Sequence, residues 1–227
     1  MDRSRSELDL EPARRPAEPR DAEPDRSNPW TTLDSRPIYE NPWIALREDS
    51  VLRPDGNPGI YGVVHFKNLA VGVLPVDSDG SIRLVGQFRY PLGRYSWEIP
   101  EGGGPPGEAP EETARRELLE ETGLVAGKLE RIVVSHLSNS VSDELAVVFR
   151  ATDLTEGPSS PEGTERIEVR SVDWPTAWSM LQAGEITDSM SVMAILHEAV
   201  RRGGSVPIEP DARGTTPAML DTRADPR

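Results

Sequence analysis

The chain of 227 residues contains no cysteine and only three histidines, and aromatic residues make up 5% of it. Without cysteine there can be no disulfide framework, no thiolate nucleophile, and no iron–sulfur or cysteine-ligated zinc centre. The three histidines are scattered along the sequence, which argues against a histidine-rich metal site. The chain is nevertheless long enough to bury a hydrophobic core without such cross-links.

The sequence also lacks any apolar run near the roughly 20 residues that cross a bilayer. Its charged N-terminus has no apolar segment of the kind found in signal peptides. We therefore expect a cytoplasmic protein with no membrane partner. Basic residues are in deficit, since 39 Asp and Glu face 25 Lys and Arg and the net charge is −14. Nucleic-acid phosphates repel such a chain, so we expect no nucleic-acid partner.

The two ends of the chain differ in composition from its middle. Residues 1–28 hold eight acids, six Arg and four Pro, but few large apolar residues. Such a segment cannot bury enough surface to offset the entropy of ordering it, which predicts a disordered tail. Residues 205–227 carry several prolines and little periodicity, which indicates a disordered or loosely docked tail. Residues 29–204 are expected to form one domain, with 29–67 as its N-terminal strand region.

Alternating and apolar segments predict a series of strands separated by turn residues. These strands cover residues 38–39, 43–51, 62–67, 69–75, 82–90, 129–135, 144–151 and 167–172. A helix is predicted from Pro110, with acids in its first turn, to Thr122, where Gly123 ends it. Two further helices are predicted over 176–183 and 190–200. Strands mixed with a few helices indicate an α/β (α+β) sandwich with a mixed sheet.

The most informative segment covers residues 102–124, GGGPPGEAPEETARRELLEETGL. On a helix, Glu117, Glu120 and Glu121 are spaced i, i+3, i+4 and share one face. Like charges at this spacing repel each other, so three carboxylates there favour a bound cation. Oxygen ligands without His or Cys suit Mg²⁺, or Mn²⁺, better than zinc. From spacing alone, a solvated acidic face is the alternative, and Glu108 could either join the site or cap the helix.

The wider spacing matches the Nudix box at every defined position. Five residues separate Gly102 from Glu108 and seven more precede Arg116-Glu117-Leu118, after which Glu120-Glu121 and Gly123-Leu124 follow at one-residue gaps. The chain therefore resembles the Nudix hydrolases over most of its core, but not over its tails. This resemblance implies a Nudix fold, an α/β/α sandwich around a mixed β-sheet with an N-terminal β-hairpin extension.

The resemblance also implies roles for the box residues. Glu117, Glu120 and Glu121 correspond to metal-binding carboxylates, and Glu120 and Glu121 also to catalytic residues. Arg116 corresponds to the residue that orients these carboxylates by ion pairing, a task that suits the guanidinium group. A backbone carbonyl near Glu101–Gly102 is implied as a further metal ligand. Mg²⁺ at such a site places a water in line with phosphorus and neutralises phosphate charge, which is the chemistry of pyrophosphate hydrolysis.

Flanking segments resemble the ADP-ribose pyrophosphatase group. Residues 97–103, WEIPEGG, are similar to its W-E-[LIVF]-P-x-G stretch, which includes Glu98 as a substrate-binding candidate. Residues 87–90, QFRY, are similar to its Q-x-R strand, in which the arginine, here Arg89, reaches the substrate phosphates. A surface strand arginine is the alternative for Arg89.

The region 30–67 resembles the N-terminal region that this group uses for dimerisation and base binding, which implies a homodimer. Trp30, Tyr39 and Trp43 are therefore candidates for stacking on a nucleobase, although each can equally be a packing aromatic.

Two later segments bear on the substrate and on the general base. Residues 138–144, SNSVSDE, resemble the family's S-P-G-x-S/T-D/E-E loop, and Glu144 is a substrate-binding candidate. The proline that marks many ADP-ribose enzymes is absent, with Asn139 near its place, so other nucleoside diphosphate sugars remain open. Relatives often keep their general base in the loop corresponding to residues 161–169. Glu165 is the first candidate and Glu162 the second, and a solvated charged loop is the alternative.

These features together predict a Mg²⁺-dependent pyrophosphatase acting on a nucleoside diphosphate sugar, with ADP-ribose as the first candidate. Its products would be a nucleoside monophosphate and a sugar phosphate. One alternative is a housecleaning enzyme that takes nucleoside triphosphates, and a second is a non-catalytic ligand sensor on a Nudix scaffold. The glycine-rich run at 102–107 is predicted to form a loop, but it lacks the residues of a P-loop and the spacing of a dinucleotide fingerprint.

Overall fold

The structure, a computed structural model, describes residues 26–157 and 167–204. Residues 1–25 and 205–227, which hold nearly all of the two predicted tails, lie outside the described residues. So do residues 158–166, which include both candidate general bases, Glu162 and Glu165. Within the part that the structure describes, no helix is long and apolar enough to cross a membrane.

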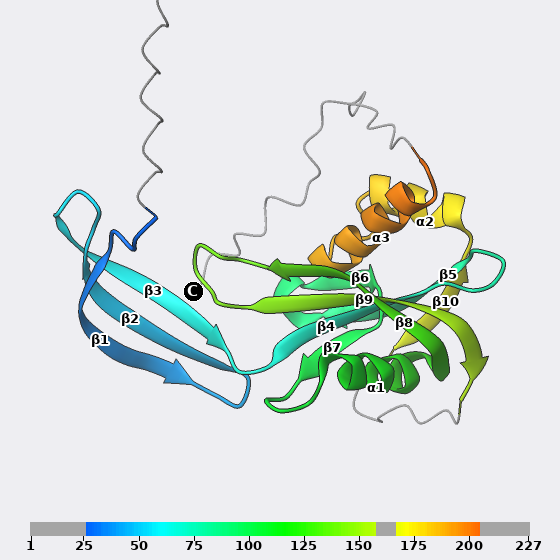
Figure 1. Ribbon diagram of the computed structural model, residues 1–227, viewed down its shortest axis with the longest axis horizontal. Helices are drawn as coiled ribbons and strands as arrows, with labels where there is room; N and C mark the ends of the chain where they lie inside the picture. Colours follow the sequence, from blue (N-terminus) through cyan, green and yellow to red (C-terminus); the bar gives the residue numbers. More distant parts are fainter. Residues whose placement is uncertain (1–25, 158–166, 205–227) are drawn as a thin grey trace, which may run out of the picture.

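The described chain contains ten strands and three α-helices, with α1 between β7 and β8 and with α2 and α3 after β10 (Figure 1). The strands are β1 (Thr31–Glu40), β2 (Ile44–Leu52), β3 (Pro58–Phe66), β4 (Leu69–Pro75), β5 (Ile82–Arg89), β6 (Arg94–Glu98), β7 (Glu101–Gly104), β8 (Leu124–His136), β9 (Leu145–Glu156) and β10 (Glu168–Val172). The helices are α1 (Pro110–Thr122), α2 (Trp174–Gln182) and α3 (Ser189–Arg201), and a 3₁₀ turn, η1, covers Tyr90–Leu92.

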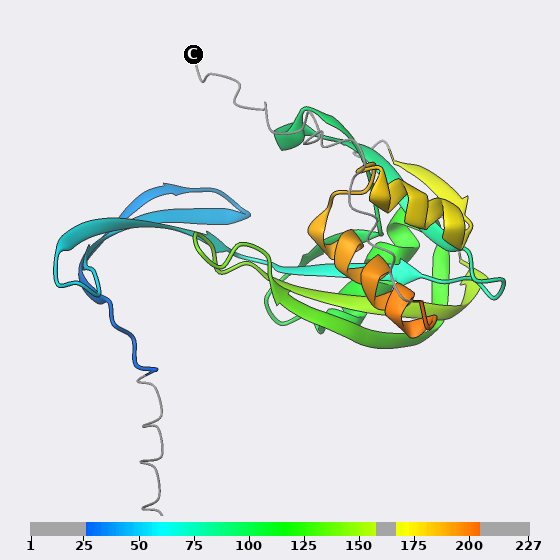
Figure 2. The same cartoon turned by 90° about the horizontal axis from the view of Figure 1, so that it is seen from above.

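A four-stranded mixed sheet forms the centre of the domain. Its order is β7-β4-β9-β8, with β4 and β9 parallel and the other pairs antiparallel. Helix α1 lies on one face, and α2 and α3 lie on the other side (Figures 1 and 2). Strand β4 is apolar on both faces because it is covered twice: Val71 and Val73 belong to the core under α1, and Leu74 belongs to the core under α3. This arrangement confirms the predicted α/β/α sandwich.

Helix α1 has the predicted bounds. Pro110 occupies its first turn, where a missing N–H costs nothing, and Glu111 and Glu112 lie near the positive end of the helix dipole. Gly123 follows it with φ of 73°, a left-handed conformation that glycine adopts without steric cost. Its N–H donates to the carbonyl of Leu119 at 2.9 Å and closes the last turn.

The glycine run after Glu101 is a strand, whereas the sequence favoured a loop. Strand β7 pairs with β4, and its alternate glycines face α1. A Cβ on Gly104 would lie 2.7 Å from Thr113 Oγ1, and one on Gly102 would overlap the carboxyl group of Glu117. On the other face, a Cβ on Gly103 would lie 2.9 Å from the Asn68 side chain. Glycine therefore lets this strand backbone approach the helix that carries the carboxylates.

The N-terminal region is a three-stranded antiparallel sheet, β1-β2-β3, in which β2 and β3 form the predicted hairpin and β1 adds a third strand. Only residues 38–39 of β1 were expected to be extended. Every residue of β1 is exposed, so it shows no alternation of buried and exposed positions, and its pairing with β2 defines it as a strand. The sheet projects from the rest of the domain (Figures 1 and 2). Its β3 edge contacts the loop before β9, where Val64 N donates to Val141 O at 2.9 Å.

Candidate active site

The acidic face of α1 lies against the backbone of β7. Glu121 Oε2 accepts a hydrogen bond from the N–H of Glu101 at 3.0 Å. The carboxyl group of Glu117, a residue only 9% exposed, fills the space beside Gly102 that a Cβ would occupy. Two of the three predicted metal-binding carboxylates are thus brought to the segment Glu101–Gly102, which was itself predicted to supply a metal ligand.

Arg116 joins these carboxylates to the loop before the helix. Its Nη1 donates to Glu117 Oε1 at 2.7 Å and to Glu120 Oε2 at 3.2 Å, and its Nη2 donates to Gly103 O at 3.0 Å. Nη2 also donates to Glu108 Oε2 at 3.1 Å, and the hydroxyl of Thr113 donates to the same oxygen at 2.7 Å. Glu108 therefore neither caps the helix nor joins the other carboxylates directly. It holds Arg116.

The charges of this cluster support one another. The hydrogen bonds that Arg116 donates to Glu108 raise the pKa of Arg116, against the effect of burial, and Glu117 raises it further. The hydrogen bonds from Arg116 and Thr113 lower the pKa of Glu108. The ion pairs that the Nudix resemblance implies for Arg116 are therefore present.

The donor set fits a hard divalent cation. Glu117, Glu120, Glu121 and the carbonyls of β7 offer only oxygen, which Mg²⁺ and Mn²⁺ prefer. The space beside Gly102 is kept open by the missing Cβ and taken by the Glu117 carboxylate. Among the described residues, no group of three or more Asp, Glu or His side chains is gathered closely enough to enclose an ion by itself. Arg116 instead lies among the carboxylates and balances their charge.

A second charged cluster centres on Arg89, at the end of β5. Its Nε donates to both carboxyl oxygens of Glu98, at 3.0 and 2.9 Å, and its Nη2 donates to Glu98 Oε2 and, at 2.8 Å, to Glu101 Oε1. Glu98 is only 2% exposed, so it can act on a substrate only through Arg89. Burial opposes the charge on Arg89, but Glu98 and then Glu101 raise its pKa above the usual arginine value. The Nη1 group makes no hydrogen bond to the described residues and can donate to a ligand.

A pocket of about 260 Å³ joins this cluster to the N-terminal sheet. Arg89, Glu101, Gly102 and Glu144 line its polar side, and Trp43 and Phe66 line the side nearer β1-β2-β3. Burial, and then the charge of Asp188, raise the pKa of Glu144. The structure thus brings predicted substrate-binding and metal-binding residues to one pocket.

Asp143, next to Glu144, is held away from this pocket. Its Oδ1 accepts from the N–H of Phe66 at 3.0 Å, and its Oδ2 lies 2.6 Å from His65 Nδ1. It therefore ties the 138–143 loop to β3. Of the three aromatic candidates, only Trp43 lines the pocket. Trp30 packs edge-on against Tyr61 with ring centroids 5.3 Å apart, and Tyr39 is exposed on β1.

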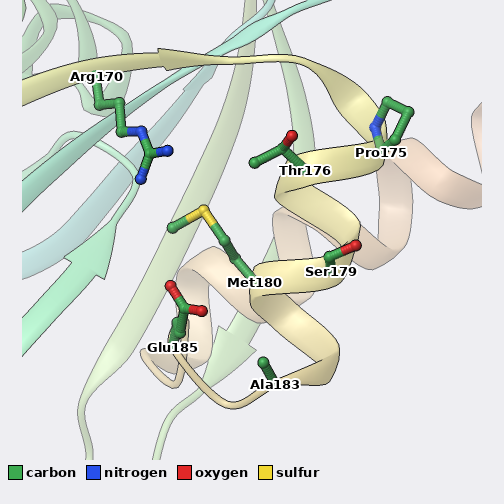
Figure 3. A pocket seen from close by; sticks show the side chains of 7 residues that line it. All are labelled: Arg170, Pro175, Thr176, Ser179, Met180, Ala183 and Glu185. Atoms are coloured by element: carbon green, nitrogen blue, oxygen red, sulfur yellow. The ribbon is translucent and has the colours of Figure 1, made fainter.

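Sequence reasoning missed Phe66, Asn68 and Met190, which also line the pocket. No local signal marks them, because they come from strand ends and a helix start that only the fold brings together. Another pocket, of about 400 Å³, lies over α2 (Figure 3). Arg170 from β10 and Glu185 point toward it from opposite sides, and Thr176, Ser179 and Met180 line it from the helix. It contains none of the predicted site residues.

Comparison with known proteins identifies the family. Residues 66–192 match the model of the NUDIX domain, and residues 30–64 match the model of the nucleoside diphosphate sugar hydrolase N-terminal domain. The chain belongs to the Nudix family. As a Nudix hydrolase, it carries the complete Nudix box on β7 and α1, together with an N-terminal sheet that has a family model of its own.

Individual relatives cover most of this Nudix hydrolase. An ADP-ribose pyrophosphatase of Bacillus subtilis (strain 168) is 36% identical over 166 residues, which are 72% of this chain and 89% of that protein. An ADP-ribose pyrophosphatase of Mycobacterium tuberculosis (strain ATCC 25618 / H37Rv) is 35% identical over 172 residues, 74% and 82% of the two chains. A solved structure, a crystal structure of an ADP compounds hydrolase, has a TM-score of 0.68 at 19% identity and covers 78% of this chain and 97% of that one. This last similarity supports the fold.

Proposed function

We propose that this Nudix hydrolase cleaves the pyrophosphate bond of a nucleoside diphosphate sugar, with ADP-ribose as the first candidate. The products are then a nucleoside monophosphate and a sugar phosphate. The observation that carries this proposal is the single pocket in which Arg89, the Glu101–Gly102 segment beside the box carboxylates, and Trp43 of the N-terminal sheet meet. The names of the relatives at 35% and 36% identity support the same substrate class.

Each part of the pocket has a task in such a reaction. Mg²⁺, when bound, supplies charge neutralisation on the phosphates and an activated water. Glu117, Glu120 and Glu121, with a carbonyl of the Glu101–Gly102 segment, would hold it. Arg116 fixes two of these carboxylates, Glu117 and Glu120, as the ion pairs at 2.7 and 3.2 Å indicate. The general base stays a prediction, with Glu165 before Glu162.

The pocket must bind the negatively charged diphosphate of the substrate, although most of the charged residues that line the pocket are acidic. Arg89 provides the cation, because its Nη1 has no partner among the described residues while Glu98 and Glu101 hold the rest of the guanidinium. Trp43 is 66% exposed beside this group and offers a ring face to a nucleobase. A sugar-linked diphosphate with a base at one end matches this order of groups.

Two other functions fit less well. A triphosphate housecleaning enzyme would need no nucleoside diphosphate sugar hydrolase N-terminal domain, yet residues 30–64 match that model. A non-catalytic sensor would not need all of the box carboxylates, and this chain keeps them. The cytoplasmic location expected from the sequence remains part of the proposal.

The N-terminal sheet supports a homodimer. Register places Tyr39, Leu46 and Val64 in one cross-strand row, and Ile60 lies farther along the same face. Tyr39 is 56% exposed and Ile60 is 72% exposed. Exposed apolar side chains on a projecting sheet favour a partner, since small sheets need cover on one face. We propose that a second copy covers it.

Light scattering coupled to size exclusion tests the dimer. Wild-type protein should elute at twice the mass of one chain, and the double variant Tyr39→Glu, Ile60→Glu should elute as a monomer. Thr32→Glu, which lies on the opposite face, should stay dimeric. A monomeric wild type would refute this part of the proposal.

A substrate panel tests the activity. Purified protein with Mg²⁺ is offered ADP-ribose, other nucleoside diphosphate sugars, dinucleoside polyphosphates and dNTPs, and phosphate release is measured after phosphatase coupling. Glu121→Gln should remove most of the activity, whereas Glu111→Gln, an exposed acid on the same helix, should not. Turnover only on triphosphates would exclude the proposed substrate class. Tight binding of one compound with no turnover at all would indicate the sensor.

The same assay separates the two candidate bases. Glu165→Gln should lower kcat strongly if Glu165 takes the proton from the attacking water. A small effect would move that role to Glu162 or to the box carboxylates, and Glu162→Gln then decides between them.

A further inference from the structure

Residues 98–101, the bridge segment, lead from β6 into β7 and are held by three different elements of the fold. The N–H of Ile99 donates to Ser191 Oγ, in α3, at 2.9 Å. The carbonyl of Pro100 accepts from a backbone N–H of β4 at 2.8 Å. The N–H of Glu101 donates to a carboxylate of α1 at 3.0 Å. The hydroxyl of Ser191 is therefore the contribution of α3 to the position of this segment.

The bridge segment carries both carboxylates that hold Arg89. Arg89 Nε donates to the two carboxyl oxygens of Glu98 at 3.0 and 2.9 Å, and Arg89 Nη2 donates to Glu101 Oε1 at 2.8 Å. Glu98 and Glu101 lie at the two ends of the segment, so a shift of its backbone moves both partners of the guanidinium. The direction of the Nη1 group of Arg89 is therefore set by the position of the bridge segment.

Ser191 is itself held firmly in place. It is fully buried in the first turn of α3, and its N–H donates to the carboxylate of Asp188, the N-cap residue, at 2.7 Å. The turn before α3 is also tied to β6, because Arg94 Nη2 donates to Thr187 Oγ1 at 2.6 Å. The Ser191 hydroxyl thus offers its oxygen to the bridge segment from a fixed position in the core.

The N–H of Ile99 has no ready substitute for this oxygen. Ile99 is fully buried, and no second acceptor for its N–H is present among the described residues. The Ile99 side chain is also closely packed, since a Cβ on Gly72 would lie 2.9 Å from Ile99 Cδ1 and 3.6 Å from Met190 Cβ. A buried N–H without an acceptor is unfavourable, so loss of the Ser191 hydroxyl favours a shift of the bridge segment.

We propose that Ser191 is a positioning residue that fixes the bridge segment and thereby directs Arg89 toward a substrate phosphate. It acts through the N–H of Ile99 and the carboxylates of Glu98 and Glu101, and it does not touch the substrate itself. The inference rests on the proposed function for its phosphate ligand, whereas the connection from Ser191 to Arg89 is a property of the protein alone.

Three variants separate positioning from a general loss of stability. Ser191→Ala removes the hydroxyl and keeps a good helix former in α3. Ile195→Val and Ile195→Ala are the matched controls, because Ile195 is also fully buried in α3 and its side chain makes no hydrogen bond. They remove one methyl group and most of the side chain, respectively, so they cover a range of packing losses. Thermal melting ranks the three variants by stability.

The first readout is KM and kcat for ADP-ribose with Mg²⁺. Ser191→Ala should raise KM about tenfold and change kcat less than about twofold, because a phosphate contact made equally in the ground and transition states affects KM alone. The folded Ile195 variants should keep the wild-type KM. The proposal is overturned if Ser191→Ala keeps the wild-type KM, or if an Ile195 variant shows the same rise in KM.

A double-mutant cycle with Arg89→Lys tests whether the effect passes through Arg89. Lysine keeps the positive charge but lacks the guanidinium fork that Glu98 and Glu101 hold. If Ser191 acts through this fork, Ser191→Ala should raise the KM of the Arg89→Lys variant by less than about twofold. A further tenfold rise in this background would overturn the proposal.

A crystal structure of Ser191→Ala gives a readout that needs no activity. It should show the bridge segment displaced and the 2.8 Å contact between Arg89 Nη2 and Glu101 Oε1 broken. An unchanged bridge segment with an unchanged Arg89 overturns the positioning role. If wild-type protein cleaves no nucleoside diphosphate sugar, the proposed function fails by that result, and this structure still decides the role of Ser191.

Discussion

Substitution of Gly102 by alanine should inactivate the candidate site by displacing the carboxylate of Glu117. A Cβ at this position would overlap the carboxyl group of Glu117, and even the more distant oxygen, Oε2, would lie at 2.5 Å. An ordinary van der Waals contact is 3.4–4 Å. Glu117 is 9% exposed and is held by Arg116, so it has little room to withdraw.

The geometry sets the size of the effect. The Glu117 carboxylate, or the β7 backbone, must move by about 1 Å, and a misplacement of that size costs about 100-fold in rate. Overpacking of this kind also costs about 1–3 kcal/mol of folding stability. We therefore expect Gly102→Ala to lose about two orders of magnitude in kcat/KM and to remain folded.

The assay measures kcat/KM for ADP-ribose across a range of Mg²⁺ concentrations, with thermal melting as the check on folding. Gly59→Ala is the matched control, because this glycine lies in strand β3 on the face away from Tyr39 and Ile60, and a Cβ there would meet only the exposed Arg53 side chain, at 3.3 Å. It should behave as wild type. A folded Gly102→Ala variant with near wild-type kcat/KM would show that the Glu117 position is not needed, and would refute the reasoning.

Two further predictions concern the charge networks. Arg116→Lys should lower kcat/KM by about 10- to 100-fold, which is the usual effect of losing a group that orients metal ligands. The reason is that lysine cannot hold Glu108, Glu117 and Gly103 O at the same time. An unchanged apparent Mg²⁺ affinity in this variant would contradict the prediction. Glu198→Gln should lower the free energy of unfolding at pH 7, measured with urea, by about 3–5 kcal/mol, because Glu198 is 2% exposed and pairs with Arg150 and Arg202. Burial opposes the Glu198 charge, but the two arginines lower its pKa, so its stabilising contribution is complete above the usual carboxyl pKa and is lost as the pH falls. The difference in free energy of unfolding between wild type and Glu198→Gln should therefore become smaller at acidic pH. A difference that does not change with pH would contradict a stabilising role for these ion pairs.

The sequence predicts best where the structural cause is local. Helix α1 begins at Pro110 and ends before Gly123 because both residues act on their own backbone. Strand β4 is marked by a continuous apolar run, since both of its faces are covered. The i, i+3, i+4 spacing of the box carboxylates places them on one helix face for the same reason, since α1 has the predicted bounds.

Elements that depend on distant partners were predicted poorly. Strand β1 has no buried residue, so its extended form comes from pairing with β2 and leaves no pattern in its own sequence. The sequence of β7 is typical of a glycine-rich loop, and the segment is a strand because it pairs with β4. The place of Met190 in the candidate site belongs to the same class, because only the packing of α3 on the sheet brings this residue to the pocket.

The most direct test of the account is the identity of the products formed from ADP-ribose. ³¹P NMR of wild-type protein with ADP-ribose and Mg²⁺ should show loss of the diphosphate signals and the appearance of AMP and a sugar phosphate. EDTA should prevent the reaction, and Glu121→Gln should nearly abolish it. If ADP-ribose and the other nucleoside diphosphate sugars remain intact under these conditions while a nucleoside triphosphate is cleaved, the central claim is wrong.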